Sequence, residues 1–263
     1  MSNIIGTAIV TGASSGIGVA YAEALARRGY NLILVARRKD RLDTLAKKLT
    51  ADTSRKVEVH VADLAKPDRI RSVEKLIAGR DDINVLVNNA GLGALGPTAK
   101  ADPDVVESLV LVNVLALTRL SMAALQGFQK RSSGTLINIA SVIALGPAKG
   151  AAAYSGSKAY VVNFSRSLEM EYAGSGIAVQ TILPGPVHSE FFEQSGITQP
   201  MFPENLYMTP EQLVSTSMKA LDMKEAFCFP ALHDKALLDE YEAARKKFSK
   251  SSVGPGTPER YAH

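Results

Sequence analysis

The alternation of short apolar runs with longer amphipathic segments constrains the fold of this chain more than any other feature of its sequence. Seven runs rich in Val, Ile and Leu are predicted to be strands, at 6–10, 31–36, 56–61, 83–87, 133–140, 177–183 and 226–230. Helices are predicted between them, near 16–29, 38–51, 67–80, 102–130, 152–175 and 210–222. Apolar strands separated by helices are typical of a parallel sheet covered on both faces. With right-handed crossovers, the pattern predicts a doubly wound α/β fold with seven mostly parallel strands.

Length and composition favour one domain. A chain of 263 residues that is 46% hydrophobic can bury one large core. No repeat or interdomain linker interrupts residues 1–248, so we expect a single domain there, with a substrate lid near 190–209. The segment 249–263 is small, polar and rich in Pro and Gly, and we expect it to be irregular.

Charge and cysteine content exclude several classes of protein. The formal net charge of +4 is too small to indicate nucleic-acid binding. The single cysteine, Cys228, cannot form an internal disulfide and lies in an apolar run, which makes it a poor candidate nucleophile. The apolar stretch 105–126 is interrupted by Glu107, Asn113 and Arg119, and the N-terminus lacks the features of a signal peptide. We therefore expect a cytoplasmic protein that does not bind membranes, and the spacing of its His, Cys and Asp residues predicts no metal site.

A glycine-rich turn joins the first predicted strand to the first predicted helix. Within "TGASSGIG", Gly12, Gly16 and Gly18 fall where the backbone must turn sharply. Glycines at such a turn let the backbone approach a pyrophosphate, which the helix N-terminus then stabilises. The spacing differs from the commonest dinucleotide fingerprint, but its position between a strand and a helix favours dinucleotide binding over a simple turn.

The end of the second predicted strand bears on cofactor choice. An acidic residue there would bind the ribose hydroxyls of NAD(H), whereas an arginine accommodates the 2′-phosphate of NADP(H). Ala36 occupies the expected acidic position and is followed by Arg37 and Arg38. A guanidinium binds phosphate through charge-assisted, bidentate hydrogen bonds. We therefore predict NADP(H), with Arg37 as the main contact and NAD(H) as the alternative.

Tyr154 and Lys158 form a candidate catalytic pair in the segment "AAAYSGSKAY". Their i, i+4 spacing places both side chains on one face of a helix. A phenol with a pKa of about 10 exchanges protons poorly near neutrality, and lowering that pKa to about 7 requires roughly 4 kcal/mol. One ammonium about 4 Å away supplies energy of that order at an effective dielectric near 20. The spacing alone occurs often by chance, so the pair needs support from its context.

Seven motifs in order supply this context, and with them the chain resembles the short-chain dehydrogenase/reductase family. The resemblance extends from residue 6 to about residue 190 and implies a compact Rossmann-type domain. Its motifs are "TGASSGIG" (11–18), "ADL" with Asp63, "NNAG" (88–91), "VNV" with Asn113, "INIASV" with Ser141, "YSGSK" (154–158) and "PGPVHSEF" (184–191).

The resemblance implies a role for each matching residue. Tyr154 would be the acid/base, Lys158 its electrostatic partner and a ligand of the nicotinamide ribose, Ser141 the carbonyl-binding hydroxyl, and Asn113 part of a proton relay. Asp63 would bind the adenine, and Ser189 would bind the carboxamide from a position where the family usually has threonine. Further cofactor contacts are implied for Ser14, Ser15, Ile17, Asn89, Ala90, Gly91, Pro184, Gly185 and Val187.

The positions of Ser141 and Asn113 in the sequence support two of these roles independently of the resemblance. Ser141 ends the fifth predicted strand, at the sheet edge where such folds bind ligands, and it can hydrogen-bond a carbonyl oxygen as charge develops there. Asn113 interrupts an apolar helical run, where an amide is a poor helix former; a kink in the helix and a water-held relay would both suit it.

The sequence favours an NADP(H)-dependent oxidoreductase acting on a ketone or aldehyde, or on a secondary alcohol. Apolar residues in 190–209, namely Phe191, Phe192, Met201, Phe202, Tyr207 and Met208, favour a bulky apolar substrate, although they could instead anchor the loop. Pro200 and Pro203 would limit the flexibility of this loop, and Gly196 could serve as a hinge. The alternatives are a reductase of carrier-protein-bound 3-oxoacyl groups and a non-catalytic dinucleotide sensor.

The apolar segment 105–125 also indicates self-association. A helix that is apolar around most of its circumference needs a second buried surface besides the sheet. The same helix of another subunit, together with the predicted helix 152–175, could provide that surface across a two-fold axis. We therefore expect a homodimer or homotetramer.

Overall fold

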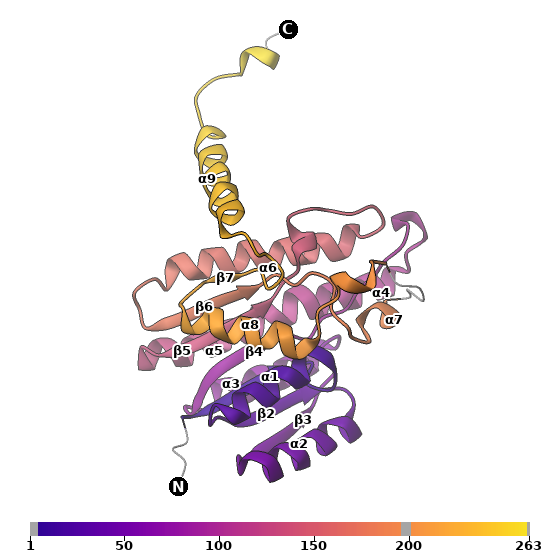
Figure 1. The fold of residues 1–263 in the computed structure, drawn as a ribbon, viewed down its shortest axis with the longest axis vertical. Coiled ribbons are helices and arrows are strands. Elements are labelled where there is room, and N and C mark those ends of the chain that lie inside the picture. Colours follow the sequence, from indigo (N-terminus) through magenta and orange to yellow (C-terminus); the bar gives the residue numbers. More distant parts are fainter. Residues whose placement is uncertain (1–4, 196–200, 262–263) are drawn as a thin grey trace. The chain divides into compact units, whose positions relative to one another are not determined.

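The computed structural model describes residues 5–195 and 201–261 of the chain, and a seven-stranded parallel sheet organises most of them. The strand order is β3-β2-β1-β4-β5-β6-β7, and every pairing is parallel. The strands are β1 (Thr7–Thr11), β2 (Asn31–Ala36), β3 (Val57–Val61), β4 (Ile83–Asn88), β5 (Gly134–Ile139), β6 (Ile177–Ile182) and β7 (Phe227–Cys228). Figure 1 shows β2 and β3 at one end of the sheet and β6 and β7 at the other. The predicted doubly wound, Rossmann-type fold is confirmed.

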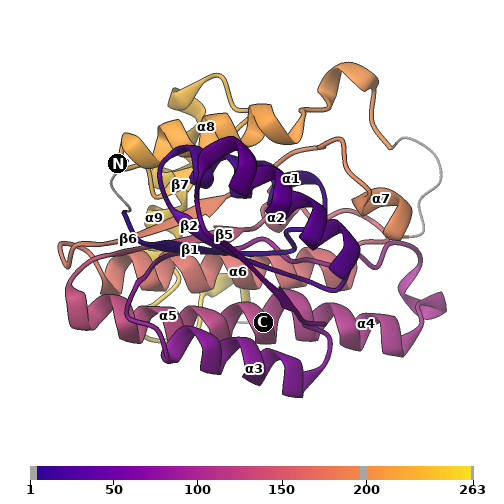
Figure 2. The same cartoon turned by 90° about the horizontal axis from the view of Figure 1, so that it is seen from below.

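Helices cover both faces of this sheet. On one face, α1 (Gly16–Arg27), α2 (Lys39–Thr53) and α8 (Pro210–Asp222) enclose one apolar core. On the other face, α3 (Pro67–Ala78), α5 (Leu117–Arg131) and α6 (Ala152–Glu171) enclose a second core. Figure 2 shows α1 and α8 on one side of the strands and α3, α5 and α6 on the other. Because both faces are buried, the inner strands are almost continuously apolar, as the sequence predicted.

The predicted helix at 102–130 is divided into three parts. It comprises α4 (Pro103–Val110), a π-helical segment η2 (Leu111–Ala116) and α5. Asp102 caps α4 by accepting a hydrogen bond from the Asp104 backbone N–H, and Pro103 occupies the first turn, where proline costs no hydrogen bond. A π segment is rare and often marks a functional site. The expected irregularity near Asn113 is therefore present.

The segment from Pro103 to Arg131 is long and apolar enough to span a membrane by length and composition alone. However, 56% of its most apolar window is buried inside the fold, as in a core helix. The buried side chains include Leu109, Leu120 and Phe128. Cytoplasmic location remains a prediction.

The chain divides into two compact units, Met1–Pro230 and Ala231–His263. The second unit contains α9 (Lys235–Ser251), which the sequence analysis did not predict, although its Ala, Leu, Glu, Lys and Arg residues are strong helix formers. The helix extends three residues into the tail expected to be irregular, and a short 3-10 turn covers Glu259–Tyr261. The single-domain boundary at residue 248 remains a prediction.

Candidate active site

A cavity of about 810 Å³ opens at the carboxyl edge of the sheet. Its walls come from the segments that directly follow β1, β2, β3, β4, β5 and β6. The sheet order reverses between β1 and β4, and ligands of such folds bind in the crevice at this reversal. The fold alone therefore places the candidate site.

Most of the predicted site residues line this one cavity. They are Gly12, Ser14, Ser15, Gly16, Ile17, Arg37, Arg38, Asp63, Asn89, Ala90, Gly91, Ser141, Tyr154, Lys158, Pro184, Gly185, Val187 and Ser189. Gly18 and Asn113 do not line it. Each contacts residues of the cavity wall or their neighbours: Gly18 packs against Gly12, and Asn113 hydrogen-bonds Leu92.

The glycine turn is held against the end of β4. Gly12 has a φ of 67°, a left-handed conformation that favours glycine. The Asn89 amide donates hydrogen bonds to the carbonyls of Thr11 (2.9 Å) and Gly12 (3.3 Å). A side chain at Gly18 would collide with the Gly12 carbonyl. Gly18 therefore allows close packing of α1 beneath the turn, and the amide of Asn89 supports the turn.

Asn113 ties three segments together. Its Oδ1 accepts a hydrogen bond from the Leu92 backbone N–H (2.8 Å), and its Nδ2 donates to the Leu92 carbonyl (2.9 Å) and to Ser157 Oγ (3.0 Å). Ser157 in turn donates to the Tyr154 carbonyl (2.7 Å). The side chain thus connects η2, the loop after β4 and the helix that carries Tyr154. It acts as a positioning residue, and its part in a proton relay remains a prediction.

Tyr154, Lys158 and Ser141 converge inside the cavity. Ser141 lies two residues after the end of β5, before a 3-10 turn at Val142–Ala144, and hydrogen-bonds the Tyr154 side chain. Lys158 Nζ lies 5.9 Å from the centroid of the Tyr154 ring and donates to the Ile139 carbonyl at 2.8 Å. The lysine is only 5% exposed. The i, i+4 spacing has therefore brought both side chains to one face of α6, as predicted.

Burial controls the protonation of this pair. Loss of solvent raises the pKa of Tyr154 to about 12, although the hydrogen bond from Ser141 opposes the rise. Loss of solvent also lowers the pKa of Lys158 to about 8. The expectation that lysine brings the phenol towards neutrality is not met in the protein alone, because burial disfavours both charged forms. At neutral pH, Tyr154 carries its proton and Lys158 is mostly an ammonium.

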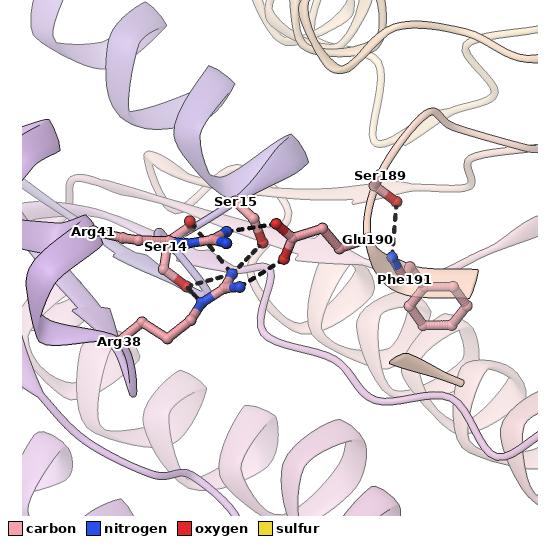
Figure 3. Close-up of polar contacts among 7 residues, drawn as sticks. All are labelled: Ser14, Ser15, Arg38, Arg41, Ser189, Glu190 and Phe191. Atoms are coloured by element: carbon pink, nitrogen blue, oxygen red, sulfur yellow. Dashed lines mark hydrogen bonds and ion pairs between the residues drawn. The ribbon is translucent and has the colours of Figure 1, made fainter. Parts of the chain in front are cut away.

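Two arginines mark the other end of the cavity, beside the glycine turn. Arg38 Nη2 donates to Ser15 Oγ (2.8 Å) and Ser14 Oγ (3.1 Å), and its Nη1 forms an ion pair with Glu190 (2.6 Å) (Figure 3). Arg37 is exposed but also lines the cavity. Both arginines can thus meet an anionic group at the mouth of the cavity.

Asp63 and Ser189 are also held in place. Asp63 Oδ1 accepts from the Ala65 backbone N–H at 3.1 Å. Ser189 Oγ donates to the Val187 carbonyl and accepts from the Phe191 N–H, both at 3.4 Å, and the latter contact is drawn in Figure 3. Both residues line the cavity, and their ligands remain predictions.

An apolar wall closes the cavity above Tyr154. The short helix α7 (Phe191–Gln194) places the Phe191 ring 5.2 Å from the Tyr154 ring, centroid to centroid. Phe192, Met201 and Phe202 also line the cavity. These contacts match four of the predicted lid residues. Gly196 and Pro200 lie outside the described residues.

The structure places Tyr207 and Met208 differently. The backbone of Met208 pairs with that of Val187 in an isolated bridge, with His188 N–H donating to the Met208 carbonyl at 3.0 Å. The Tyr207 ring stacks on the His188 ring at 4.9 Å. Neither residue lines the cavity, so both anchor the base of the lid, which was the alternative considered for these side chains.

Sequence analysis missed two loops on the substrate side. Residues 92–97 follow the "NNAG" motif, and residues 142–151 connect Ser141 to α6; several of each line the cavity. A hydrogen bond from Gly96 N–H to the Gly150 carbonyl (2.8 Å) joins the two loops. Their position after the carboxyl ends of β4 and β5 is the signal that could have identified them.

The described part of the chain offers no candidate metal site, and its cysteine is a poor nucleophile. Among residues 5–195 and 201–261, no group of three or more His, Cys, Asp and Glu side chains is arranged to hold a metal ion. Cys228 is buried, and burial raises the pKa of its thiol to about 12, so it is a weak nucleophile.

Two known proteins match most of this chain in sequence. A 17-beta-hydroxysteroid dehydrogenase type 3 from Danio rerio is 35% identical over 219 residues, covering 81% of this chain and 69% of the relative. A very-long-chain 3-oxoacyl-CoA reductase from Anas platyrhynchos is 34% identical over 223 residues, covering 82% and 69%.

Two solved structures superimpose closely on the chain. A short-chain dehydrogenase from Sphingobium yanoikuyae in complex with NADPH is 36% identical, with a TM-score of 0.93 over 97% of this chain and 100% of the other. The bulky-bulky ketone specific alcohol dehydrogenase from Comamonas testosteroni is 34% identical, with a TM-score of 0.90 over 99% and 100%. Residues 6–199 match the family described as short chain dehydrogenase. The chain therefore belongs to the short-chain dehydrogenase/reductase family of oxidoreductases.

Proposed function

We propose that this protein uses NADP(H) to interconvert a bulky, apolar ketone and the corresponding secondary alcohol. One observation carries the proposal: a single cavity contains Tyr154, Ser141 and Lys158, an apolar wall at one side, and a glycine turn with two arginines at the other. A non-catalytic sensor of dinucleotides would not require the proton-transfer residues to converge in this way.

The residues present fit a phosphorylated dinucleotide. The glycine turn at the N-terminus of α1 can accept a pyrophosphate, because no side chain at Gly12 or Gly16 blocks the backbone. Arg37 and Arg38 offer guanidinium groups for a 2′-phosphate. Ala36, at the end of β2, supplies no carboxylate for ribose hydroxyls. When bound, the nicotinamide would supply or accept the hydride.

Side chains of the protein act on the substrate oxygen. In reduction, the carbonyl carbon gains a hydride and its oxygen gains the proton of the Tyr154 hydroxyl; oxidation reverses both transfers. Because burial keeps Tyr154 protonated, the acid form of the phenol is the one present at neutral pH. Ser141 can donate a hydrogen bond to the same oxygen as charge develops there. Lys158 lies beneath the ring as a buried cation that favours the phenolate left behind.

The lid supports the choice of substrate class. Phe191, Phe192, Met201 and Phe202 present apolar surface to the cavity, next to the Tyr154 ring. Such a wall excludes water and favours apolar ligands. A long-chain 3-oxoacyl thioester is a second candidate substrate, since it also places a ketone beside apolar surface and one relative is a 3-oxoacyl-CoA reductase. A 3-oxoacyl group bound to a carrier protein, the alternative substrate suggested by the sequence, is also a 3-oxoacyl thioester.

We expect Tyr154→Phe to lower kcat by about 10²- to 10⁴-fold, the usual contribution of a positioned proton donor. The Kd for NADPH should change little, because only the hydroxyl is removed. Tyr172→Phe, the same change at the end of α6, is the matched control and should leave kcat intact. Near wild-type reduction by Tyr154→Phe would disprove the assignment.

Cofactor preference should depend on Arg37. We expect Arg37→Asp to reduce kcat/KM for NADPH by about 10- to 100-fold relative to NADH, because it replaces a charge-assisted phosphate contact with a repulsive carboxylate. Lys39→Asp makes the same charge change two residues away, outside the cavity, and should preserve the preference. A wild-type enzyme that favours NADH would refute the choice of cofactor.

Lid substitutions should separate substrate binding from cofactor binding. Phe202→Ser should raise KM for bulky ketones by about 10-fold, in line with roughly 1.5 kcal/mol of lost apolar burial, and leave the Kd for NADPH unchanged. Leu206→Ser, an exposed position in the same segment that does not line the cavity, is the control. If KM stays constant across a series of ketone sizes, the lid does not line the substrate pocket.

We also propose that the chain forms a homodimer or homotetramer. An exposed face on α5 and α6 includes Met122, which is 56% exposed, and Tyr160, whose hydroxyl bonds Thr118 at 2.7 Å. Leu115 is a further exposed apolar residue, in η2, two turns from Met122. An apolar face of this kind on adjacent helices supports association across a two-fold axis.

Light scattering at micromolar concentration should therefore give the mass of at least two chains. Met122→Glu should shift the protein towards monomer, because it buries a charge in the proposed interface. Met223→Glu makes the same change at another exposed methionine, at the end of α8, and should leave the mass unaltered. A wild-type protein that is monomeric under these conditions would contradict the proposal.

A further inference from the structure

A carboxylate from the lid binds Arg38, one of the two arginines that we assign to the cofactor phosphate. Glu190 immediately precedes α7, and its Oε2 lies 2.6 Å from Arg38 Nη1. Its Oε1 lies 2.5 Å from Arg41 Nη1. Figure 3 shows both guanidinium groups facing the Glu190 carboxylate, with Ser14 and Ser15 beside Arg38. Hydrogen bonds from Arg41 and Arg38 lower the pKa of Glu190, so the carboxyl is ionised at neutral pH.

The hydrogen bonds of Arg38 leave little room for another anion. A guanidinium has five N–H groups. Arg38 Nε donates to Ser14 Oγ at 3.2 Å, Nη2 donates to Ser14 and Ser15, and Nη1 donates to Glu190. Among the described residues, one Nη1 hydrogen is left over. A bidentate contact with phosphate needs two, so one present partner must be released.

Glu190 is the partner that a phosphate would replace. Ser14 and Ser15 are neutral and belong to the glycine turn, where they can remain as further donors to an anion. Glu190 carries a negative charge that repels a phosphate at the same guanidinium. Its side chain is 34% exposed, so it can move into solvent without leaving a buried charge behind.

Release of Glu190 would also act on the lid. The next residue, Phe191, contacts the Tyr154 ring, at 5.2 Å between centroids, and its N–H binds Ser189 Oγ. The ion pairs with Arg38 and Arg41 therefore connect the start of α7 to the phosphate side of the cavity. Movement of Glu190 would loosen the segment that places the apolar wall over the catalytic tyrosine.

We propose that Glu190 is a cofactor-discriminating residue: its carboxylate competes with the 2′-phosphate of NADP(H) for Arg38, and its displacement releases the lid. A cofactor without this phosphate has no anionic group that competes with Glu190 for Arg38. It would leave the ion pairs of Glu190 with Arg38 and Arg41 intact. Glu190 would then reduce the intrinsic affinity for NADP(H), and only the phosphorylated cofactor would affect the lid. This inference rests on the proposed NADP(H) preference.

Adenosine 2′,5′-bisphosphate and adenosine 5′-monophosphate (AMP) test the competition directly, because they differ only in the 2′-phosphate and both lack the nicotinamide. We expect titration calorimetry to show that Glu190→Gln binds the bisphosphate about two- to fivefold more tightly than wild type, the range that corresponds to one exposed ion pair. Affinity for AMP should match that of wild type. Glu193→Gln removes the same charge from the exposed face of α7 and should bind both ligands like wild type.

The outcomes separate this inference from the proposed function. If wild type binds both ligands equally, the NADP(H) preference fails and the inference fails with it. If wild type prefers the bisphosphate and Glu190→Gln binds it no more tightly, the inference alone is wrong. Weaker binding by Glu190→Gln would also overturn it, since Glu190 would then orient Arg38 for the phosphate.

Limited chymotrypsin digestion tests the connection to the lid. In wild type, the bisphosphate should accelerate cleavage after Phe191 and Phe192 several-fold, and AMP should not. Glu190→Gln should be cleaved at the faster rate without ligand, while Glu193→Gln should behave like wild type. Equal cleavage rates in wild type with either ligand would contradict the release of the lid.

Discussion

Parallel strand pairing is the constraint on which every other feature of this site depends. Because all seven strands run in the same direction, their carboxyl ends meet at one edge, and the order reversal between β1 and β4 opens a crevice there. The glycine turn, the residues after β4, Ser141 and the lid all reach the cavity from this edge. The crossover helices contribute Tyr154 and Lys158 from α6. Residues distant in sequence therefore meet at this edge.

Burial is the second determinant of the chemistry. The cavity removes water from Tyr154 and Lys158, and this loss moves the two pKa values in opposite directions, to about 12 and about 8. Tyr154 is thus kept protonated at neutral pH, whereas the pKa of Lys158 lies close to neutral pH. Asn113 contributes through position rather than charge, since its amide holds the loop after β4 and, through Ser157, the start of α6. The local π-helical geometry of η2 accompanies this connection.

The sequence predicted the features that depend on periodicity and short motifs. Strand and helix positions followed from apolar alternation, and the Tyr154–Lys158 spacing required only a helix. Contacts between distant segments were not predictable. The Glu190–Arg38 ion pair joins residues 152 positions apart, and the anchoring of Met208 on Val187 depends on the path of the lid. The sequence does not show how deeply Tyr154 is buried, and for this reason the expected lowering of its pKa was wrong. Helix α9 was missed although its composition favours a helix.

Transfer of a labelled hydride tests the central claim most directly. NADPH deuterated at either the pro-R or the pro-S position of its nicotinamide C4 should be incubated with the protein and a bulky, apolar ketone, and the alcohol analysed by mass spectrometry. A cavity that places the substrate carbonyl between Tyr154 and one face of the nicotinamide predicts deuterium at the carbinol carbon from one label only. Absence of NADPH oxidation with every ketone tested, or deuterium from both labels, would contradict the account.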